Sequence, residues 1–185
     1  MAFEIEIKLR LPDGLSKIRR ILRERGFRIV KRRSLETNVL FDNVKHSLGK
    51  HGKLIRIRRV GGHGLLTYKG PPMRGKHKKR EEIEIDLADP DQLQEIIGNI
   101  GFHPVFRYEK YRTEYSARSG PGKIMLDETP IGNFLEIEGS ASWIDRTSKL
   151  LGFRHADYLK ASYGSLYRAY CREQGKRAKD MLFRT

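Results

Sequence analysis

The sequence is poor in cysteine and tryptophan and contains no long apolar run. One of its 185 residues is cysteine, Cys171, and one is tryptophan, Trp143. A lone cysteine cannot form an intramolecular disulfide, which excludes the disulfide frameworks of small secreted proteins. No apolar stretch approaches the roughly 20 residues that span a bilayer, and the N-terminus lacks an apolar run of the signal-peptide type. We therefore expect a soluble, cytoplasmic protein without a membrane partner.

Common catalytic and metal-binding motifs are also missing. There is no G-x-x-x-x-G-K-[ST] loop, and the six histidines do not have the spacing of a zinc site. Cys171 lies in a tyrosine-rich segment without a His or Asp companion, which favours a packed side chain over a catalytic thiol. Trp143, near the start of an expected helix, is interpreted as a packing residue.

Acidic residues are few in comparison with basic ones. The chain has 38 Lys and Arg against 23 Asp and Glu, a formal net charge of +15. A field of this sign concentrates anions, a class that includes nucleic acid, polyphosphate and phosphorylated metabolites. The length suits one domain with its own core. We expect a single domain over residues 1–173 and a basic, solvated tail over residues 174–185.

Four segments have the helical spacing of apolar residues: 13–25, 90–100, 142–151 and 158–173. Asp13 is the expected N-cap of the first, and glycines at 26, 101 and 152 are expected to end the first three. Strands separate the helices. Clusters of turn-forming residues at 61–64, 119–122 and 130–133 predict tight turns, and therefore antiparallel hairpins, between several of these strands.

A short acidic pattern occurs three times, and each copy is followed by a helical segment and a Gly-Phe pair. The copies are Glu4-Ile5-Glu6, Glu82-Ile83-Glu84 and Glu136-Ile137-Glu138. Any one copy is compatible with compositional bias, but three copies in the same order indicate a repeated strand-helix unit.

Charged and aliphatic residues alternate along the predicted strands, so each strand has one charged and one apolar face. Arg56 and Arg58 share a face on one strand, and Glu136 and Glu138 share a face on another. One interpretation is an antiparallel sheet whose charged face meets water and whose apolar face is covered by helices. The other is a closed barrel with a charged interior and an apolar exterior jacketed by the four helices. Like charges side by side oppose folding unless something binds them, which favours the barrel.

A charged interior needs ligands of both signs. Paired carboxylates suit Mg²⁺ or Mn²⁺, and facing Arg and Lys side chains need an anion, so a metal-bound polyphosphate meets both requirements. The expected interior acids are Glu4, Glu6, Glu82, Glu84, Asp127, Glu136 and Glu138, and the expected interior bases are Lys8, Arg56, Arg58, Lys69, Lys110, Arg112 and Lys160. Seven acids and seven bases cancel, so the excess positive charge should lie outside, above all on the basic loop 74–80.

These motifs, in this order, resemble the CYTH superfamily, the triphosphate tunnel metalloenzymes. Residues 4–8 match the family's Glu-x-Glu-x-Lys signature, and further similar segments are 54–58, 66–71, 80–84, 108–112, 126–128 and 134–139. Residues 160–163 resemble the family's C-terminal Lys and Ser-Tyr element. The resemblance extends from residue 3 to about residue 168.

The resemblance implies an α+β fold: a closed eight-stranded antiparallel β-barrel, the triphosphate tunnel, surrounded by helices. By position, it implies that Glu4, Glu6 and Glu138 bind one Mg²⁺ or Mn²⁺ ion, and that Asp127 and Glu136 help to bind a second. The implied phosphate-binding residues are Lys8, Arg56, Arg58, Lys69, Lys110, Arg112 and Lys160. Lys8, Lys69 and Glu84 are the candidate catalytic residues.

The resemblance is compatible with two reactions of a small triphosphate substrate. A hydrolase directs activated water at the terminal phosphorus, whereas a class IV adenylate cyclase directs the ribose 3′-hydroxyl of ATP at the alpha phosphorus and releases pyrophosphate. Some class IV cyclases have a His-Phe pair before the acidic signature, whereas three residues precede Glu4 here, which favours hydrolysis of tripolyphosphate, thiamine triphosphate or a nucleoside triphosphate. A polyphosphate-binding module without turnover and a nucleic-acid-binding protein that uses the basic surface stay open. A monomer and a homodimer are both compatible with the sequence.

Overall fold

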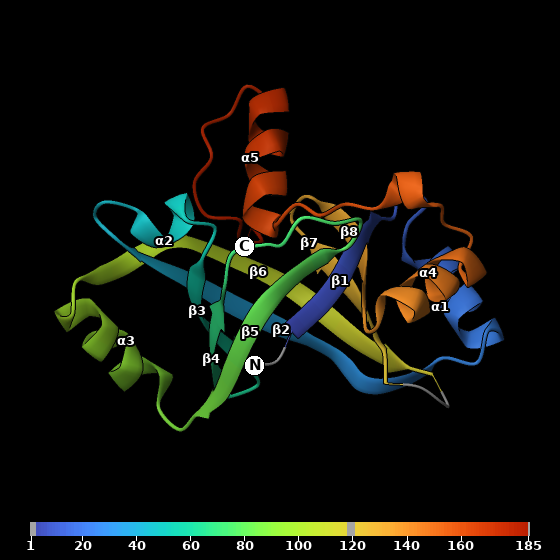
Figure 1. The fold of residues 1–185 in the computed structure, drawn as a ribbon, viewed down its shortest axis with the longest axis horizontal. Coiled ribbons are helices and arrows are strands. Elements are labelled where there is room, and N and C mark those ends of the chain that lie inside the picture. The colour runs from blue at the N-terminus through green and yellow to red at the C-terminus, as the bar shows by residue number, and fades with distance from the viewer. Residues whose placement is uncertain (1–2, 118–120, 185) are drawn as a thin grey trace.

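The computed structural model describes residues 3–117 and 121–184, which form eight strands and five α-helices. The strands are β1 (Phe3–Arg10), β2 (Arg28–Asn43), β3 (Leu54–Val60), β4 (His63–Lys69), β5 (Lys78–Leu87), β6 (Phe102–Ser116), β7 (Lys123–Thr129) and β8 (Gly132–Glu138). They close into an antiparallel barrel in the order β1-β5-β4-β3-β2-β6-β7-β8 (Figure 1). The predicted α+β class and closed eight-stranded barrel are confirmed.

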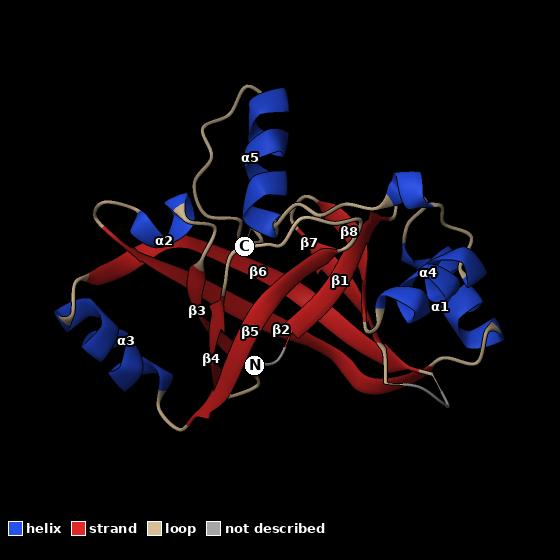
Figure 2. Ribbon diagram, in the orientation of Figure 1, coloured by secondary structure: helices blue, strands red, loops and turns tan. Residues whose placement is uncertain are grey.

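The helices lie outside the barrel (Figure 2). They are α1 (Leu15–Glu24), α2 (Ser47–Lys50), α3 (Pro90–Asn99), α4 (Ala141–Leu150) and α5 (Tyr163–Glu173), with a 3₁₀ turn η1 (His155–Asp157). In Figure 1, α1 and α4 lie at one end of the molecule and α3 lies at the opposite end. Within the described residues, none of the helices combines the length and the hydropathy that a bilayer crossing requires.

The four helices predicted from the sequence are present, and two of them start later than predicted. Gly14, not Asp13, is the N-cap residue of α1, and Asp13 forms an ion pair with Lys17 instead. α5 begins at Tyr163 rather than at residue 158, because the preceding segment is extended. There, the backbone of Leu159 exchanges two hydrogen bonds with Lys8 of β1.

The short helix α2 was not predicted, because four residues are too few to show a periodic pattern. Asp42, at the end of β2, holds this helix in place. Its carboxylate accepts hydrogen bonds from the backbone N–H groups of Leu48 (3.0 Å) and Gly49 (2.8 Å). These bonds satisfy donors that the first turn of a helix leaves without partners.

The predicted strand-helix unit recurs three times, as β1–α1, β5–α3 and β8–α4. Each helix ends before a glycine with positive φ: 79° at Gly26, 89° at Gly101 and 90° at Gly152. The predicted turns at 61–64 and 130–133 join β3 to β4 and β7 to β8. The predicted turn at 119–122 includes residues outside the described part of the chain.

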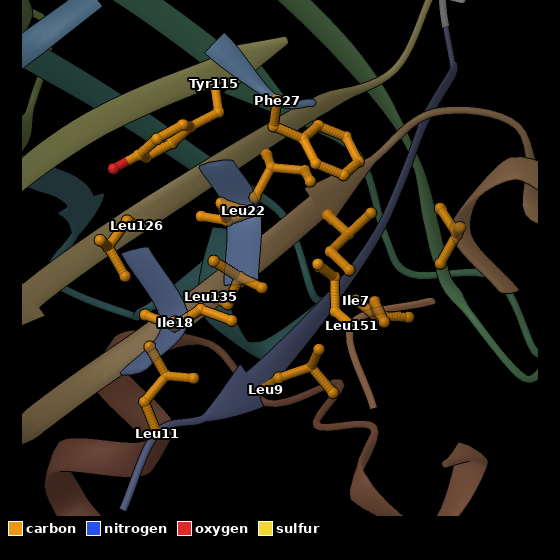
Figure 3. Packing of buried hydrophobic residues seen from close by; sticks show 13 residues of the cluster. Ile7, Leu9, Leu11, Ile18, Leu22, Phe27, Tyr115, Leu126, Leu135 and Leu151 are labelled. Carbon is orange, nitrogen blue, oxygen red and sulfur yellow. The ribbon is translucent and has the colours of Figure 1, made fainter. Parts of the chain in front are cut away.

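The largest apolar cluster lies on the outer side of the barrel wall, under α1 and α4 (Figure 3). Ile7 and Leu9 of β1 are buried there together with Ile18 and Leu22 of α1. The aliphatic face of β1 therefore points outward, and its charged face points into the barrel. This arrangement excludes the alternative in which the charged faces form the outer surface of an open sheet.

The helical jacket is incomplete over β5. Ile83 and Ile85, on the outer face of this strand, are 53% and 52% exposed. The helices therefore surround the barrel as predicted but leave this part of its apolar exterior uncovered. The helix that follows β5 lies at one end of the molecule (Figure 1).

The residues after α5 fold back along β6. Residues 174–179 are exposed, as predicted for a solvated tail, but the prediction is wrong for the part around Met181. Met181 is fully buried, and its backbone exchanges hydrogen bonds with Arg107 and Glu109 of β6. The N–H of Phe183 donates to the Glu109 carboxylate at 3.1 Å. Since β6 pairs with β7 only from Tyr111 onward, the tail covers a strand edge that would otherwise be exposed.

Candidate active site

A cavity of about 950 Å³ lies inside the barrel. Fourteen basic side chains line it: Lys8, Lys31, Lys50, Lys53, Arg56, Arg58, Lys69, Lys78, Arg80, Lys110, Arg112, Lys123, Lys160 and Arg168. Eight acidic side chains line it: Glu4, Glu6, Asp42, Glu82, Glu84, Glu114, Glu136 and Glu138. The difference, fourteen minus eight, is six positive charges. Six of the basic side chains are exposed: Lys31, Lys50, Lys53, Lys123, Lys160 and Arg168. This excess therefore lies on the outer part of the lining, where it attracts a polyanion. Glu36 and Asp127 do not line the cavity, but they pair with Lys110 and Arg112 and add two negative charges to the interior.

Two residues assigned to the outer basic loop line the barrel cavity instead. Lys78 and Arg80 belong to β5 and point inward. Lys78 Nζ lies 2.5 Å from a Glu6 carboxylate oxygen, and Arg80 donates to the carbonyl oxygen of Gly70 at 2.9 Å. Both residues share the period-two face of Glu82, so the alternation rule, extended back along the strand, could have placed them inside.

Acidic and basic residues face each other across most of the strand ladders. The opposed pairs are Lys8–Glu136, Arg112–Asp127, Lys69–Glu82, Lys110–Glu36 and Lys78–Glu6. In each pair, a nitrogen and an oxygen atom lie 3.5 Å apart or closer. Many of the like charges that lie side by side on one strand are thus neutralised by opposite charges on the neighbouring strand. The register of the strands decides which charges meet in this way.

Glu6 and Glu138 are an exception, because they lie opposite each other on the ladder between β1 and β8. Glu4 shares their inward face. Burial, together with the negative charges of Glu6 and Glu82, raises the pKa of Glu4 to about 7. Burial also raises the pKa of Glu138, and Glu82 and Glu6 add to that rise. We call Glu4, Glu6, Glu82 and Glu138 the acidic wall.

The acidic wall has the donor chemistry of a Mg²⁺ or Mn²⁺ site, since both ions prefer carboxylate oxygens. In the part of the chain that the structure describes, no three Asp, Glu, His or Cys side chains converge closely enough to enclose an ion. Lysines lie among the carboxylates instead: Lys69 Nζ contacts Glu4 and lies 3.1 Å from Glu82. A divalent ion held by Glu4, Glu6 and Glu138 would take over the charge compensation that the lysines provide.

A basic wall of Arg56, Arg58, Lys110 and Arg112 lies on β3 and β6, across the barrel from β1. Arg56 donates to Tyr108 Oη and Thr67 Oγ1, each at 3.1 Å, but its Nε has no hydrogen-bond partner among the described residues. Arg58 Nε also has none there, and it lies 3.8 Å from Glu36 Oε2. Buried guanidinium donors without acceptors are suited to phosphate oxygens.

Asp127 and Glu136, the predicted ligands of a second metal ion, already have cationic partners. Asp127 does not line the cavity; it is fully buried and accepts hydrogen bonds from Arg112 Nε (2.7 Å) and Tyr163 Oη (2.6 Å). Glu136 lines the cavity and accepts a hydrogen bond from Lys8 Nζ at 2.5 Å. Burial would raise the pKa of Glu136, but Lys8 and Arg112 lower it well below its usual range. The second ion stays a prediction.

The other predicted site residues also line the cavity. Lys8 and Lys69 are buried, whereas Glu84 is exposed and accepts a hydrogen bond from Thr67 Oγ1 at 2.7 Å. Lys160 is exposed and donates to the carbonyl oxygen of Gly75 at 2.9 Å. Every predicted site residue except Asp127 therefore lines this same cavity.

Sequence reasoning missed Glu36, Tyr108 and Tyr163. Tyr108 precedes Lys110 by two residues, so the alternation rule could have placed it inside. Tyr163 belongs to the segment 160–163 that resembles the family's C-terminal element and to the predicted helix 158–173, but no site role was assigned to it, because the helical period does not tell which face meets the barrel. Glu36 had no comparable signal. Burial would raise its pKa, but the charges of Lys110 and then Arg112 lower it to about 2.

Comparisons with known proteins agree with this architecture. The CYTH domain matches residues 2–150. A candidate adenylate cyclase of Methanocaldococcus jannaschii is 32% identical over 148 residues, which cover 80% of this chain and 83% of that protein. The solved structure of the PH1819 protein from Pyrococcus horikoshii OT3 has a TM-score of 0.73 and 28% identity, covering 90% of this chain and 99% of that one.

A third similar structure is that of HpAC1 from Hippeastrum, a candidate adenylyl cyclase described as having a dominant triphosphatase activity. It has a TM-score of 0.66 and 19% identity, and the match covers 96% of this chain and 98% of that one. At this level of identity the similarity shows the fold.

Proposed function

The chain belongs to the CYTH domain family, and on this premise we propose that it is a divalent-metal-dependent enzyme that hydrolyses a triphosphate held inside the barrel. The observation that carries the proposal is the presence of the acidic wall and the basic wall in one cavity. A metal-bound triphosphate is a ligand that satisfies both walls.

The residues of the two walls have separate roles in this proposal. When bound, Mg²⁺ or Mn²⁺ would offset the phosphate charge and lower the pKa of a bound water. Arg56 and Arg58 would donate to phosphate oxygens and stabilise the charge that develops on the transferred phosphoryl group. Lys8 and Lys69 would bind phosphate oxygens as well, once their carboxylate partners engage the metal ion. Glu84 is the candidate residue for orienting the attacking water.

The second candidate function is conversion of ATP into cyclic AMP and pyrophosphate. The name of the Methanocaldococcus jannaschii relative favours it, whereas the dominant triphosphatase activity of HpAC1 favours hydrolysis. Both reactions use the same acidic and basic walls and differ in the nucleophile and in the phosphorus atom attacked. The walls alone are therefore compatible with either reaction.

The experiment that tests the proposal is a product assay with purified protein. Tripolyphosphate, ATP and thiamine triphosphate are offered in parallel with Mg²⁺ or Mn²⁺, and orthophosphate, pyrophosphate and cyclic AMP are measured together. We expect orthophosphate without cyclic AMP. Cyclic AMP with an equal amount of pyrophosphate would replace hydrolysis by the second function. Metal-dependent binding without any product would identify a binding module, and absence of both binding and product would overturn the proposal.

A matched pair of variants links the activity to the cavity. Glu4→Gln removes a charge of the acidic wall, so it should abolish metal-dependent turnover. Glu24→Gln removes an exposed charge on α1, where Glu24 pairs with Arg20 at 3.8 Å, and should leave turnover unchanged. Full activity of the Glu4 variant would show that the product arises elsewhere.

A further inference from the structure

A second cavity, of about 440 Å³, lies between α5, the turn that joins β7 to β8, and the C-terminal residues. Its lining consists of Pro130, Ile131, Tyr167, Tyr170, Cys171, Lys176, Arg177, Met181, Leu182, Phe183 and Arg184. None of these residues lines the barrel cavity, so the two spaces are separate. The function proposed above makes no use of this second cavity.

The inner part of the second cavity is apolar and aromatic. Ile131, Cys171 and Met181 are buried, with exposed fractions of 6%, 3% and 0%. Ile131 and Met181 belong to a packed cluster against which the rings of Tyr167 and Tyr170 lie. A floor of this composition suits a planar ring, because most small-molecule sites combine apolar or aromatic walls with a few polar groups.

The outer part of the second cavity is positively charged. Lys176, Arg177 and Arg184 are exposed, and the lining contains no Asp or Glu. Among the residues that the structure describes, none of these three side chains forms an ion pair or a side-chain hydrogen bond. Three uncompensated cations around one concave surface attract an anion, and they discriminate against cationic ligands.

We propose that this cavity is a binding site for a small organic anion that carries a planar ring and a phosphate group, of the size of a nucleoside monophosphate. The ring would pack on the partly exposed rings of Tyr167 and Tyr170, which lie over the buried Met181. The phosphate would accept hydrogen bonds from Lys176 and Arg177, the type of charge-assisted contact that fixes an anion most strongly. This site is independent of the reaction inside the barrel.

The four methionines of the chain provide a direct test, because two of them report on different cavities. Met181 lines the second cavity and Met125 lines the barrel cavity. In protein labelled with ¹³C at the methionine methyl groups, the two signals are assigned with the variants Met181→Leu and Met125→Leu. AMP is then titrated into protein that is saturated with tripolyphosphate. We expect the Met181 signal to shift in a saturable manner while the Met125 signal stays at its tripolyphosphate-bound position.

Two further ligands and two variants show what the site binds. Adenosine, which lacks the phosphate, and inorganic phosphate, which lacks the ring, should each bind at least about tenfold more weakly than AMP. The double variant Lys176→Gln/Arg177→Gln should weaken AMP binding by about tenfold or more for the same reason. The matched control, Lys17→Gln/Arg20→Gln on α1, changes two exposed cations that line neither cavity and should leave AMP binding unchanged.

Three results would overturn the proposal. The first is a Met181 signal that does not move at millimolar AMP. The second is an equal response to AMP and adenosine that the Lys176/Arg177 variant leaves unchanged, which would identify an apolar crevice without anion recognition. The third is a Met181 shift that tripolyphosphate abolishes, which would place AMP in the barrel. Since none of these results depends on turnover, the outcome is independent of the proposed triphosphatase activity.

Discussion

The hydroxyl of Tyr163, on α5, donates a hydrogen bond to Asp127 Oδ2 at 2.6 Å. Lys110 donates to the same oxygen at 2.9 Å, and Arg112 donates to both carboxylate oxygens. Asp127 has no exposed surface, so this carboxylate compensates two buried cations of the basic wall and connects them to the helix outside the barrel. These contacts indicate a structural role for a residue that the family resemblance implies to be a metal ligand.

The first prediction separates these two roles of Asp127. Asp127→Asn removes the negative charge between Lys110 and Arg112 and should lower the free energy of unfolding by about 3 kcal/mol, because buried cations lose their compensation. Chemical denaturation measures this change. Asp13→Asn, at an exposed carboxylate, is the control and should change stability by less than about 1 kcal/mol. A stable Asp127 variant with greatly weakened metal binding would instead establish the ligand role.

The second prediction concerns the two faces of β3. Arg56→Gln removes a buried guanidinium that points into the cavity, and it should lower kcat by about 100-fold, because charge stabilisation in the transition state is lost. Arg59→Gln, on the outer face of the same strand, removes an exposed ion pair with Asp91 and should leave kcat unchanged. Steady-state kinetics on the preferred triphosphate measures both values. Equal losses in the two variants would point to a general effect on the fold rather than to phosphate binding.

The sequence could predict which side chains of each strand point into the barrel. It could not predict which side chains of neighbouring strands those residues would face. Alternation along β3 places Arg56 and Arg58 together, and the structure has them on one wall of the cavity. The same alternation does not tell that Lys8 faces Glu136 or that Glu6 faces Glu138, because register depends on how distant strands pair. The sequence therefore indicated which side chains are inside, but not which of their charges stay uncompensated.

The second cavity was beyond sequence reasoning for a related reason. The segment around Met181 has no period-two or helical pattern, and it is ordered by backbone hydrogen bonds to Arg107 and Glu109 of β6. Its position depends on the edge that β6 leaves open, which is a property of the closed barrel. A composition rich in basic residues predicts a solvated tail when no tertiary partner is known.

The third prediction concerns acid stability and Glu36. The Glu36 carboxyl is nine-tenths buried or more, and Lys110 and Arg112 overcome the effect of burial and hold its pKa at about 2, below the ordinary value of 4.5. A depressed pKa means that the charged form stabilises the folded state at pH values above about 4.5, and that this stabilisation is lost as the pH falls toward 2. Its size is about 3 kcal/mol.

Unfolding experiments in denaturant across this pH range measure the effect of Glu36. Glu36→Gln should be less stable than the parent protein near neutral pH, and the difference should shrink as the pH falls from about 4.5 toward 2. The control Glu24→Gln, at an exposed surface pair, should follow the parent curve. A constant difference between parent and Glu36 variant at every pH would show that the pKa of Glu36 is the same in the folded and unfolded states.

The last prediction concerns the contact between Trp143 and Gly122, which supports the interpretation of Trp143 as a packing residue. A Cβ atom at residue 122 would lie 2.4 Å from both Cε3 and Cζ3 of the Trp143 ring, a distance that requires the ring or the strand to move. Gly122→Ala should therefore lower the free energy of unfolding by about 1–3 kcal/mol, the usual cost of overpacking.

Gly98→Ala is the matched control. Gly98 lies in α3, where an added Cβ would meet no atom within 4 Å, so the change should raise stability by up to about 1 kcal/mol through helix propensity. Denaturation under the same conditions measures the change in the free energy of unfolding for both variants. A decrease for Gly122→Ala with an increase for Gly98→Ala would show that the contact with Trp143 decides the result. No change for Gly122→Ala would show that α4 can move away from the barrel without cost.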